Sequence, residues 1–409
     1  MSVFGLLGRK LSHSFSPMIH AELGNCGYGL FEKEPDELEE FLTQGDFKGL
    51  NVTIPYKKAV IPFCAELSDT ARDIGSVNTI TRLGDGSLYG DNTDYYGFSY
   101  LLKKTGADPS AGKTVVLGSG GSSLTVQAVL RDCNAGDVVV VSRTGADNYG
   151  NIGKHSDAVL IVNTTPVGMY PDTGVSPIGD LSVFKYCRTA IDIIYNPSRT
   201  RLLLQAEDMG IRTANGLLML VAQAKKSAEL FARASIPDGR IEDIAQKIAC
   251  MTQNIILIGM PGCGKSSIGA ELADRMEREF ADTDDLVVKA AGKSIPEIFS
   301  DNGEDAFRDL EQEALTEICK RSGVVVSTGG GIIKRKENLD TIRQNGVVIF
   351  LDRDIADLPT SGRPLSQSEG VAELAKARLP VYLQWADTFV TVCGVEETAE
   401  EIFTWLRKE

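Results

Sequence analysis

Histidine is scarce in this chain of 409 residues, and paired cysteines and long apolar runs are missing. The three histidines stand at positions 13, 20 and 155, so we expect no metal site built from several imidazoles. The eight cysteines are scattered singly without a C-x-x-C pair, which argues against a zinc knuckle or a disulfide framework and favours reduced thiols. No stretch approaches the length of a membrane span, and the first residues carry no basic segment followed by an apolar one. We therefore expect a cytoplasmic protein.

The charge of the chain is one-sided. Acidic residues outnumber basic ones by 56 to 42, and the formal net charge is −14. Nucleic acid and anionic membrane surfaces would repel such a chain, so neither is expected as a partner. Small anionic substrates remain compatible with this charge, because local arginines can hold them. The length fits two or three domains, and the hydrophobic content of 43% suffices for large cores.

Short runs rich in β-branched residues recur along the chain, and a helical pattern follows each of them. This alternation predicts an α/β fold with parallel sheets and covering helices. The turn signal Pro237-Asp238-Gly239 and a short amphipathic run after it place the main boundary near residue 250. The expected strands are 3–7, 49–54, 114–117, 138–141, 158–162, 190–194, 255–258, 324–327 and 347–351.

Residues 257–269 carry the strongest single motif. An apolar strand pattern runs into a glycine loop that fits G-x-x-x-x-G-K-[ST], with Gly259, Gly264, Lys265 and Ser266 at its fixed positions. In this order, backbone N–H groups and a helix N-terminus face phosphate oxygens. Lys265 would reach the β- and γ-phosphates of a nucleoside triphosphate, and Ser266 would hold Mg²⁺. A chance glycine loop, the alternative, would not explain the strand and the helix on either side.

A second glycine turn follows the expected strand 114–117. It fits the dinucleotide pattern G-x-G-x-x-G only in part, because Gly118 and Gly120 match while Ser123 stands at the third glycine position. A simple strand–helix turn explains it about equally well. The next strand ends near Arg143, where an arginine favours the 2′-phosphate of NADP and an acidic residue would favour NAD. A solvated surface arginine is the alternative at this position.

Small polar residues gather after strands in the first 100 residues. Each group alone fits a turn with side-chain caps. Together the groups offer hydroxyls, amides, a lysine and a carboxylate, a set that suits a small polyhydroxylated acid. The groups are Ser12-His-Ser14-Phe-Ser16-Pro17, Asn51-Val-Thr53-Ile-Pro55-Tyr-Lys57-Lys58, Asn78-Thr79 and Asp91-Asn-Thr-Asp94.

These residues resemble the shikimate dehydrogenase family, over residues 1 to about 235. The family's pattern is S-x-S-P, N-V-T-x-P-x-K, V-N-T, N-T-D, G-x-G-G, N-R-T, N-x-T-P-x-G-M, D-x-x-Y-N-P-x-x-T-x-L and G-x-x-M-L-x-x-Q-A, and the chain follows it in this order. The later motifs lie at Asn163 to Met169, Asp192 to Pro197 and Gly216 to Ala224. So many motifs in order make the resemblance specific.

The resemblance implies a dehydrogenase that reduces 3-dehydroshikimate to shikimate with NADPH, with Lys57 and Asp94 as its catalytic pair. Hydride transfer to a ketone builds negative charge on the oxygen, which a lysine can stabilise and protonate while a carboxylate orients the lysine. The residues implied to bind shikimate are Ser14, Ser16, Asn51, Thr53, Asn78, Asp94, Tyr195 and Gln223. Those implied to bind NADP(H) are Gly118, Ser119, Gly120, Gly121, Ser122, Ser142, Arg143, Thr144 and Gly216.

The chain departs from the family pattern after the second glycine turn. Ser142 replaces the asparagine of N-R-T, and only nineteen residues lead from Thr144 to Asn163, so a helix there would be lost or reduced. Asp147 stands where a second basic residue would grip the 2′-phosphate. The choice between NADP and NAD therefore stays open.

The second half carries motifs that suit phosphoryl transfer. Asp282 and Asp284 end an expected strand and could hold Mg²⁺ and a substrate hydroxyl, although two exposed loop aspartates are the alternative. The later motifs are F-R-x-x-E from Phe307, G-G-G from Gly329, R-P-L from Arg363 and R-L-P-V-Y from Arg378. With the phosphate loop, this series resembles shikimate kinase over residues 254–409. The spacing also matches, with seventeen residues from Lys265 to Asp282 and forty-three to Arg308.

This second resemblance implies phosphorylation of shikimate by ATP. Arg308 and Arg378 would grip the substrate carboxylate, Asp284 would orient or deprotonate the hydroxyl, and Arg363 would stabilise the transferring phosphoryl group. The implied substrate-binding residues are Asp284, Arg308, Gly329, Gly330, Gly331 and Arg378. The implied nucleotide-binding residues are Gly262, Cys263, Gly264, Lys265, Ser266, Ser267 and Arg363, and Ser266 with Asp282 would serve the metal. The family's adenine-stacking arginine is missing near Ala356, and the lid segment up to Arg378 is short.

The expected architecture has four parts. Residues 1–100 would form a substrate-binding domain that a helix at about 215–235 completes, and residues 101–214 a Rossmann-like nucleotide domain. A linker at 236–252 would lead to a P-loop kinase domain at 253–409 with a parallel sheet. The sequence thus predicts a bifunctional enzyme that makes shikimate and then shikimate 3-phosphate, with small molecules as its partners.

Two other interpretations stay open beside this one. Related domains can serve as metabolite-sensing regulators with weakened catalytic sites, but such a protein would have lost the lysine or the phosphate loop and gained an interaction module. Lys57, Asp94, Lys265, Ser266 and Asp284 are all present. Alternatively, the dehydrogenase half could act on quinate, which the sequence does not distinguish from shikimate.

Overall fold

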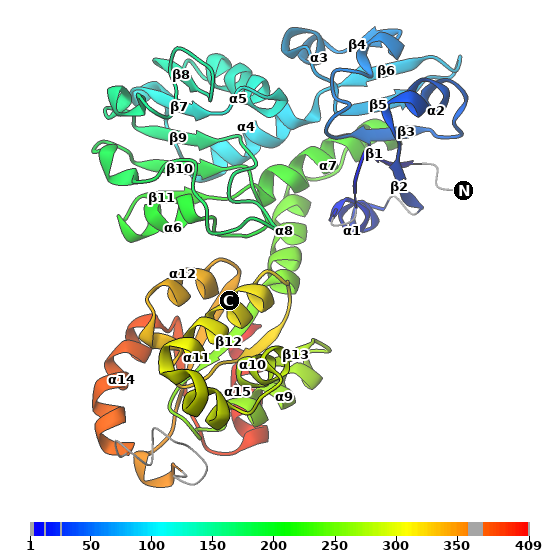
Figure 1. Cartoon of the computed structure of the whole chain (residues 1–409). Helices are drawn as coiled ribbons and strands as arrows, with labels where there is room; N and C mark the ends of the chain where they lie inside the picture. Colours follow the sequence, from blue (N-terminus) through cyan, green and yellow to red (C-terminus); the bar gives the residue numbers. More distant parts are fainter. Residues whose placement is uncertain (1–3, 12–13, 25–26, 359–370, 408–409) are drawn as a thin grey trace. The chain divides into compact units, whose positions relative to one another are not determined.

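Three β-sheets form within the described residues, which are 4–11, 14–24, 27–358 and 371–407 in this computed structural model. Contacts divide the chain into two compact units, Met1–Met169 with Val175–Lys247 and Tyr170–Gly174 with Ile248–Glu409. The first unit holds two of the sheets and the second unit holds the third (Figure 1). The expected α/β fold is confirmed. No helix in the described ranges is long and apolar enough to cross a membrane.

The first sheet is mixed, with strand order β2-β1-β3-β5-β6-β4. β1 pairs in parallel with β2 and β3, while β5 is antiparallel to both β3 and β6. Leu50 and Val52 pack in one core with Leu38 and Leu42, and the period of two along a strand turns Asn51 to the other face. The elements are β1 (Phe4–Gly8), α1 (Ser16–Glu22), β2 (Tyr28–Glu32), α2 (Leu38–Gln44), β3 (Gly49–Val52), β4 (Glu66–Leu67), α3 (Asp69–Ile74), β5 (Thr79–Arg82) and β6 (Leu88–Asp91).

Two long helices of the first unit pack directly on each other, α4 (Thr93–Thr105) after β6 and α7 (Leu217–Ala232) near the end of the unit. A Cβ atom at Gly97 would lie 2.7 Å from the carbonyl oxygen of Met219, so a larger residue would force these helices apart. Asp94 is three positions before Gly97 and therefore shares its helix face, which faces Gln223 of α7. The close helix pair thus brings two distant predicted site residues together.

The second sheet is parallel throughout, in the order β11-β10-β9-β7-β8. Neighbouring residues of β7 face opposite cores: Val116 packs with residues of α4, α5 and α7, and Val115 packs with residues of α6. This is the layered arrangement that buried β-branched strands predict. The elements are β7 (Thr114–Leu117), α5 (Gly121–Asp132), β8 (Val138–Val141), β9 (Leu160–Asn163), β10 (Thr189–Asp192), α6 (Arg201–Asp208) and β11 (Arg212–Ala214).

The connection between β8 and β9 confirms the expected loss of a helix. Only a 3₁₀ turn, Ile152–His155, lies between the two strands. Ile152 and Tyr149 still pack on the core, so the shortened crossover covers part of the sheet face. Val138 to Val140 of the edge strand remain half-buried.

The segment 236–252, expected to link the two halves and to carry a short amphipathic run, contains the helix α8 (Gly239–Thr252). Ile241 and Ile244 of this helix are buried, and Asp238 just before it pairs with Lys225 at 2.8 Å. The first unit therefore extends to Lys247, beyond the expected end of the dehydrogenase half. The turn signal at Pro237-Asp238-Gly239 directly precedes this helix, and the main boundary expected near residue 250 falls between Lys247 and Ile248.

The third sheet is parallel, in the order β13-β14-β12-β15-β16. Its central strands are buried and mostly apolar, as expected for strands that helices cover on both faces. The elements are β12 (Asn254–Ile258), α9 (Lys265–Arg275), β13 (Phe280–Asp282), α10 (Thr283–Ala291), α11 (Ile295–Cys319), β14 (Val325–Ser327), α12 (Glu337–Arg343), β15 (Gly346–Asp352), α14 (Val371–Trp385), β16 (Thr388–Thr391) and α15 (Val395–Leu406).

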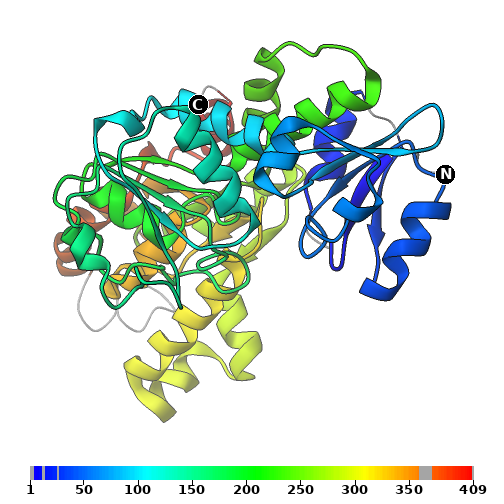
Figure 2. The ribbon, with the colours of Figure 1, turned by 90° about the horizontal axis from the view of Figure 1, so that it is seen from above.

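Helices α10 and α11 lie side by side beyond β13 (Figure 2). They enclose a small core of their own around Val287, Ile298 and Phe307. Gly303 has φ 83° and ψ 177°, so α11 is two helices joined by a kink at this glycine. The second of them carries Arg308 and Glu311 back toward the sheet.

Candidate active sites

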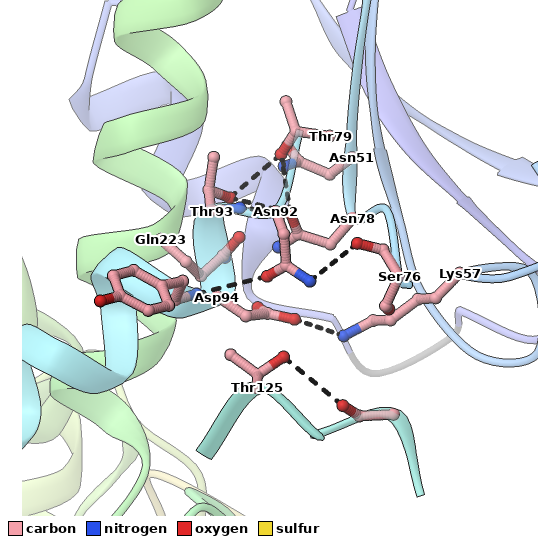
Figure 3. Close-up of polar contacts among 12 residues, drawn as sticks. Asn51, Lys57, Ser76, Asn78, Thr79, Asn92, Thr93, Asp94, Thr125 and Gln223 are labelled. Atoms are coloured by element: carbon pink, nitrogen blue, oxygen red, sulfur yellow. Dashed lines mark hydrogen bonds and ion pairs between the residues drawn. The ribbon is translucent and has the colours of Figure 1, made fainter. Parts of the chain in front are cut away.

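Lys57 and Asp94 form a partly buried ion pair in the first unit (Figure 3). Lys57 stands in the turn after β3, and Asp94 in the first turn of α4, which Asn92 caps by accepting a bond from the Tyr95 N–H. The Lys57 Nζ lies 2.6 Å from the Asp94 Oδ2, with side chains that are 18% and 10% exposed. A cation so placed could stabilise and protonate an alkoxide, and the carboxylate holds it in position.

Three predicted amide residues lie around this pair, and the protein already bonds each of them. The Asn78 oxygen accepts from the backbone N–H of Thr93 at 2.7 Å. The Asn51 nitrogen donates to Ser227 at 2.7 Å and its oxygen accepts from Tyr28 at 2.8 Å. The Gln223 nitrogen donates to the backbone oxygen of Leu220 at 2.9 Å. Figure 3 shows these three residues near the ion pair, with Asn51 on β3, Asn78 just before β5 and Gln223 on α7.

The predicted hydroxyl residues lie at two other places in this unit. Ser16 begins α1, and its N–H donates to the Ser14 hydroxyl at 3.2 Å. The Tyr195 ring lies 5.5 Å from the Phe15 ring between these serines, and burial raises the pKa of its phenol. Thr53 follows β3, and its N–H donates to the Leu7 carbonyl at 2.9 Å.

The second glycine turn forms the expected strand–turn–helix. Gly118 has φ 104°, and a Cβ atom there would lie 2.9 Å from the Thr164 hydroxyl, so only glycine fits. Gly120 precedes α5 and Gly121 begins it, with Ser119 exposed and Ser122 half-buried beside them. The helix N-terminus is therefore open to an anionic group, which is the feature that a dinucleotide pyrophosphate needs.

Ser123, which stands at the third glycine position of the pattern, is buried and accepts a bond from Gln127 at 3.0 Å. The serine is thus accommodated within α5. Gly216, another predicted cofactor residue, caps α7. A Cβ atom at Gly216 would lie 1.9 Å from the Ile193 carbonyl oxygen, so this glycine allows a close backbone contact with the end of β10.

The loop after β8 carries Ser142, Arg143 and Thr144. The Ser142 N–H donates to the Asp147 carbonyl at 3.1 Å and closes the loop, while Arg143 and Thr144 are exposed at its tip. The Asp147 carboxylate does not share this tip, because it lies 2.9 Å from the His155 ring nitrogen. Arg143 therefore remains available to a phosphate, and Asp147 is directed to another partner.

Asp192, which belongs to one of the predicted motifs, has a structural role. It is buried at the end of β10, accepts bonds from Asn163 at 3.0 Å and Thr200 at 2.7 Å, and caps the chain near Ile194. Burial raises its pKa to about 6. The motif thus joins β9, β10 and the start of α6 beneath the nucleotide turn.

The phosphate loop of the second unit lies between β12 and α9, as predicted. Gly259, Gly262 and Gly264 have φ values of 150°, 84° and 107°, which side chains other than glycine rarely adopt. The Lys265 ammonium is buried and donates to the carbonyls of Gly259 and Met260, both at 3.0 Å. Cys263 is fully buried inside the loop. Ser267 follows on α9 and, like Gly262, Gly264 and Ser266, lines a cavity of about 680 Å³.

A carboxylate pair faces the phosphate loop from β13 and α10. The Ser266 hydroxyl donates to the Asp282 Oδ2 at 2.6 Å, and the Asp282 Oδ1 accepts from the Asp284 N–H at 2.9 Å. The Asp284 Oδ1 is buried without a hydrogen-bond partner. Burial, followed by the nearby charges of Asp282 and Glu311, raises the Asp284 pKa to about 6. A carboxylate with that pKa is suited to accept a proton near neutral pH.

The far end of the same cavity holds two arginines. The Arg308 Nη1 donates to Glu311 at 2.7 Å, and its remaining nitrogens donate to Glu304. The Arg378 Nη1 donates to the Gly330 carbonyl at 2.8 Å, whereas its buried Nη2 has no partner. Arg378 is therefore the freer of the two to bind a carboxylate.

Gly329, Gly330 and Gly331 bring the backbone close to these groups. A Cβ atom at Gly329 would lie 2.4 Å from Glu311 Oε1, and one at Gly331 would lie 2.3 Å from Arg308. A Cβ atom at Gly330 would meet Pro261 at 2.7 Å. The three glycines therefore hold open the wall of the cavity between the phosphate loop and the arginines.

Two residues of this cavity were missed from the sequence. Glu311 is buried, has one oxygen without a partner, and anchors Arg308. Its place in F-R-x-x-E was the signal, because three positions on a helix put it on the face of Arg308. Arg353, just after β15, lines the cavity beside the phosphate loop, whereas Ala356 is exposed. Arg363 lies outside the described residues.

The side chains beside the phosphate loop offer donors to a metal ion. Ser266 and Asp282 supply a hydroxyl and a carboxylate beside the phosphate loop, which suits Mg²⁺ because that ion takes its other ligands from phosphates and water. Within the described ranges no cluster of three or more histidine, cysteine or acidic side chains could hold a metal. The site therefore fits a metal that arrives with a nucleotide.

Fold and sites together define an α/β enzyme with a Rossmann-like dinucleotide domain in one unit and a P-loop kinase domain in the other. Residues 6–80 match the shikimate dehydrogenase substrate-binding domain, and residues 261–408 match shikimate kinase. A shikimate dehydrogenase (NADP⁺) from Clostridium perfringens is 36% identical over 271 residues, which cover 61% of this chain and 99% of the relative. The chain belongs to the shikimate dehydrogenase family and continues into a shikimate kinase domain, which makes it a bifunctional enzyme of the shikimate pathway.

Solved structures agree with this assignment for the first part of the chain. Shikimate 5-dehydrogenase from Thermus thermophilus, in complex with NADP(H) and shikimate, is 31% identical, with a TM-score of 0.55 over 60% of this chain and 99% of that structure. Quinate dehydrogenase from Corynebacterium glutamicum, in complex with NAD, is 26% identical, with a TM-score of 0.54 over 59% of this chain and 97% of that structure.

Proposed function

We propose that the first unit reduces 3-dehydroshikimate to shikimate with NADPH, and that the second phosphorylates shikimate with ATP to give shikimate 3-phosphate. The observation that carries the first reaction is the Lys57–Asp94 pair at 2.6 Å, surrounded by amides and hydroxyls. The second reaction rests on one cavity that joins the phosphate loop to Asp284 and Arg378. The product of the first site would be the substrate of the second.

In the reductive direction, Lys57 stabilises the developing alkoxide and donates its proton to the oxygen, and Asp94 keeps the ammonium in place. When bound, NADPH supplies the hydride. The open N-terminus of α5 at Gly121 would hold its pyrophosphate, and Arg143 its 2′-phosphate. Asn78, Gln223, Ser14 and the other predicted residues would bind the ring hydroxyls and the carboxylate.

In the kinase unit, Asp284 accepts the proton of the attacking hydroxyl or orients it toward the phosphate loop. Lys265 would leave its carbonyl partners to neutralise the β- and γ-phosphates, and Arg378 would bind the shikimate carboxylate. Ser266 and Asp282 would hold Mg²⁺, which supplies charge neutralisation at the phosphates. The nucleoside would extend toward Arg353 and Val395, the residues that line the cavity on the side of β15 and β16.

Quinate is the second candidate substrate of the dehydrogenase unit. The similarity to quinate dehydrogenase from Corynebacterium glutamicum, solved with NAD, favours keeping it as a rival for both substrate and cofactor. Arg143 and the C. perfringens and T. thermophilus relatives support NADP(H) and shikimate. A regulatory role is not favoured, because the acid–base and phosphate-binding groups of both units are in place.

One set of assays on the purified full chain tests the proposal. We expect NADPH oxidation with 3-dehydroshikimate, faster oxidation of shikimate than of quinate, and ATP consumption only when shikimate is present. EDTA should abolish the kinase reaction and added Mg²⁺ should restore it. A folded protein that reduces no dehydroshikimate with either cofactor would refute the first half. Preference for quinate and NAD⁺ would establish the rival.

A further inference from the structure

A triangle of buried hydroxyls lies behind the predicted substrate amides of the first unit. It consists of Thr79 on β5, Thr93 at the start of α4 and Ser227 on α7, with all three oxygen–oxygen distances 3.0 Å. The residues are 1%, 1% and 0% exposed. Figure 3 shows Thr79 and Thr93 in contact beside Asn51 and Asn78. None of the three hydroxyls is needed for the reaction chemistry.

Each hydroxyl of this triangle carries one proton, and the fixed donors and acceptors around the triangle decide how the two amides are turned. The Ser227 hydroxyl can donate only once, and the Gln223 carbonyl oxygen lies 2.9 Å from it as an acceptor. Ser227 then accepts from Asn51, whose amide nitrogen lies 2.7 Å away and also reaches Thr79 at 3.3 Å. The NH₂ group of Asn51 is thereby turned inward, and its carbonyl oxygen faces Tyr28.

The orientation of Asn78 follows from the same network. The backbone N–H of Thr93 can only donate, and it lies 2.7 Å from the Asn78 oxygen. The hydroxyls of Thr79 and Thr93 lie 3.1 and 3.2 Å from that oxygen and can donate to it as well. The Asn78 oxygen is thus held inward, which leaves its NH₂ group as the donor that Asn78 can offer to a ligand.

We propose that Ser227, together with Thr79 and Thr93, is a positioning residue that fixes the orientation of the Asn51 amide and sets which edge of the Asn78 amide meets the substrate. This inference rests on the proposed dehydrogenase function. Asn78 presents donors and the Asp94 carboxylate presents acceptors, so a ring hydroxyl between them would accept from Asn78 and donate to Asp94. A ketone or hydrogen at that ring position could not make both bonds. The hydroxyl triangle would therefore contribute to the choice of substrate without touching it.

Four variants of the full chain separate positioning from simple core packing. Ser227→Ala removes the acceptor of the Asn51 amide, and Thr79→Val removes a second hydroxyl at nearly constant volume. Thr79→Ser keeps the hydroxyl and should restore function. Thr81→Val is the matched control, because Thr81 lies on the same strand and its buried hydroxyl has no hydrogen-bond partner. The kinase activity of each variant reports on the integrity of the rest of the chain.

The readouts are kcat and KM for 3-dehydroshikimate, KM for NADPH, and the ratio of kcat/KM for shikimate to that for an analogue lacking one ring hydroxyl. We expect Ser227→Ala and Thr79→Val to lower kcat/KM by about 5- to 20-fold, mainly through the KM for dehydroshikimate, since a mispositioned hydrogen bond weakens binding by about that factor. The ratio between shikimate and the analogue should shrink, whereas the KM for NADPH should not change. Thr79→Ser and Thr81→Val should resemble the parent.

The outcomes distinguish this inference from the proposed function. If the parent protein reduces no dehydroshikimate, the proposed function fails first. If the parent is active and both Ser227→Ala and Thr79→Val keep its kinetics and its discrimination, the positioning role is overturned. An equal loss in Thr81→Val and Thr79→Val would also overturn it, since that would indicate general destabilisation. Should Ser227→Ala fail to fold, the Thr79→Val and Thr79→Ser pair still decides the question.

Discussion

Lys57 and Lys58 are adjacent in sequence but differ in environment. Lys57 is partly buried and pairs with Asp94, whereas Lys58 is exposed. We predict that Lys57→Ala lowers dehydrogenase turnover by roughly 10²–10⁴-fold, the usual effect of losing a general acid. Lys58→Ala is the matched control and should leave turnover intact. Steady-state reduction of dehydroshikimate measures both, and near-normal turnover of Lys57→Ala would remove that residue from its proposed role.

The raised pKa of Asp284 makes a prediction about pH. Burial is the largest cause of the shift to about 6, so the free enzyme protonates this carboxyl as the pH falls through that value. A protonated Asp284 cannot accept the proton of the substrate hydroxyl. We therefore expect kinase kcat/KM to be constant from pH 7 to 8 and to fall toward tenfold per unit below about pH 6.

Asp284→Asn provides the control for that profile, because its residual activity should lack the step near pH 6. The dehydrogenase reaction, assayed in the same buffers, shows whether the whole chain loses activity at low pH. A wild-type kinase profile that stays flat down to pH 5 would contradict the role given to Asp284.

Arg143 makes a prediction about cofactor choice. It is exposed at the tip of the loop after β8, and Asp147 is directed to His155 rather than to this tip. Arg143→Ala should weaken binding of NADPH more than that of NADH, because only NADPH carries the 2′-phosphate. Dissociation constants from fluorescence titration measure the difference, with Arg131→Ala on α5 as an exposed control. Equal losses for both cofactors would show that Arg143 does not hold the phosphate.

For individual residues, some contacts in space can be predicted from the sequence and others cannot. The resemblance to shikimate kinase placed Asp282 beside the phosphate loop in advance, and the structure gives the physical reason, because residues that end parallel strands meet at one edge of a sheet. The pairing of Lys57 with Asp94 followed from the family motifs. The hydroxyl triangle could not be predicted, since Thr79 and Ser227 lie far apart in sequence and meet only because α7 returns to the first sheet. Their types are common in turns and helices and carry no spacing signal.

Two connecting segments show how far secondary structure could be predicted from the sequence. They are the short crossover between β8 and β9 and the segment 236–252. The nineteen residues after Thr144 leave no room for a full helix, and only the 3₁₀ turn Ile152–His155 forms. The short length of this segment was therefore enough to predict the loss of the helix. The segment 236–252 was expected to link the two halves, with a short amphipathic run after its Pro-Asp-Gly turn signal, and that run forms α8. Asp238 and Glu242 of this segment pair with Lys225 of α7 and Lys104 of α4, contacts that a local pattern does not reveal.

Helix α8 therefore belongs to the stability of the first unit, and two shortened chains test this. A chain that ends at residue 235 lacks the buried Ile241 and Ile244 and the partners of Lys225 and Lys104, Asp238 and Glu242. Burying an isoleucine contributes about 1.5–3 kcal/mol. We expect its melting temperature to lie at least about 5 °C below that of a chain ending at residue 247, at about 2–4 °C per kcal/mol. Equal melting curves in circular dichroism would show that α8 adds no stability to the first unit.

For the whole molecule, the main boundary between the units falls inside α8, although the segment Tyr170–Gly174 is also assigned to the second unit. Lys247 closes the first unit and pairs with Glu22 of α1, whereas Ile248 opens the second. The last turn of the helix contacts the kinase sheet region, where the Gly323 N–H donates to the Thr252 carbonyl at 3.0 Å. Each unit nevertheless has separate cores and its own candidate site. The two activities therefore share a helix but no catalytic group.

Independence of the two sites is the prediction that follows for the full chain. Lys265→Ala should abolish phosphoryl transfer, because the β- and γ-phosphates lose their fixed cation, and Asp284→Asn should impair it strongly. Neither residue belongs to the first unit, so dehydrogenase kcat and KM should be unchanged in both variants. Lys57→Ala should in turn leave the kinase intact. Chains divided after Lys247 should each keep one activity when assayed separately. A first unit that is insoluble or inactive after this cut would mean that the units depend on a common core, and the division into two catalytic units would then be wrong.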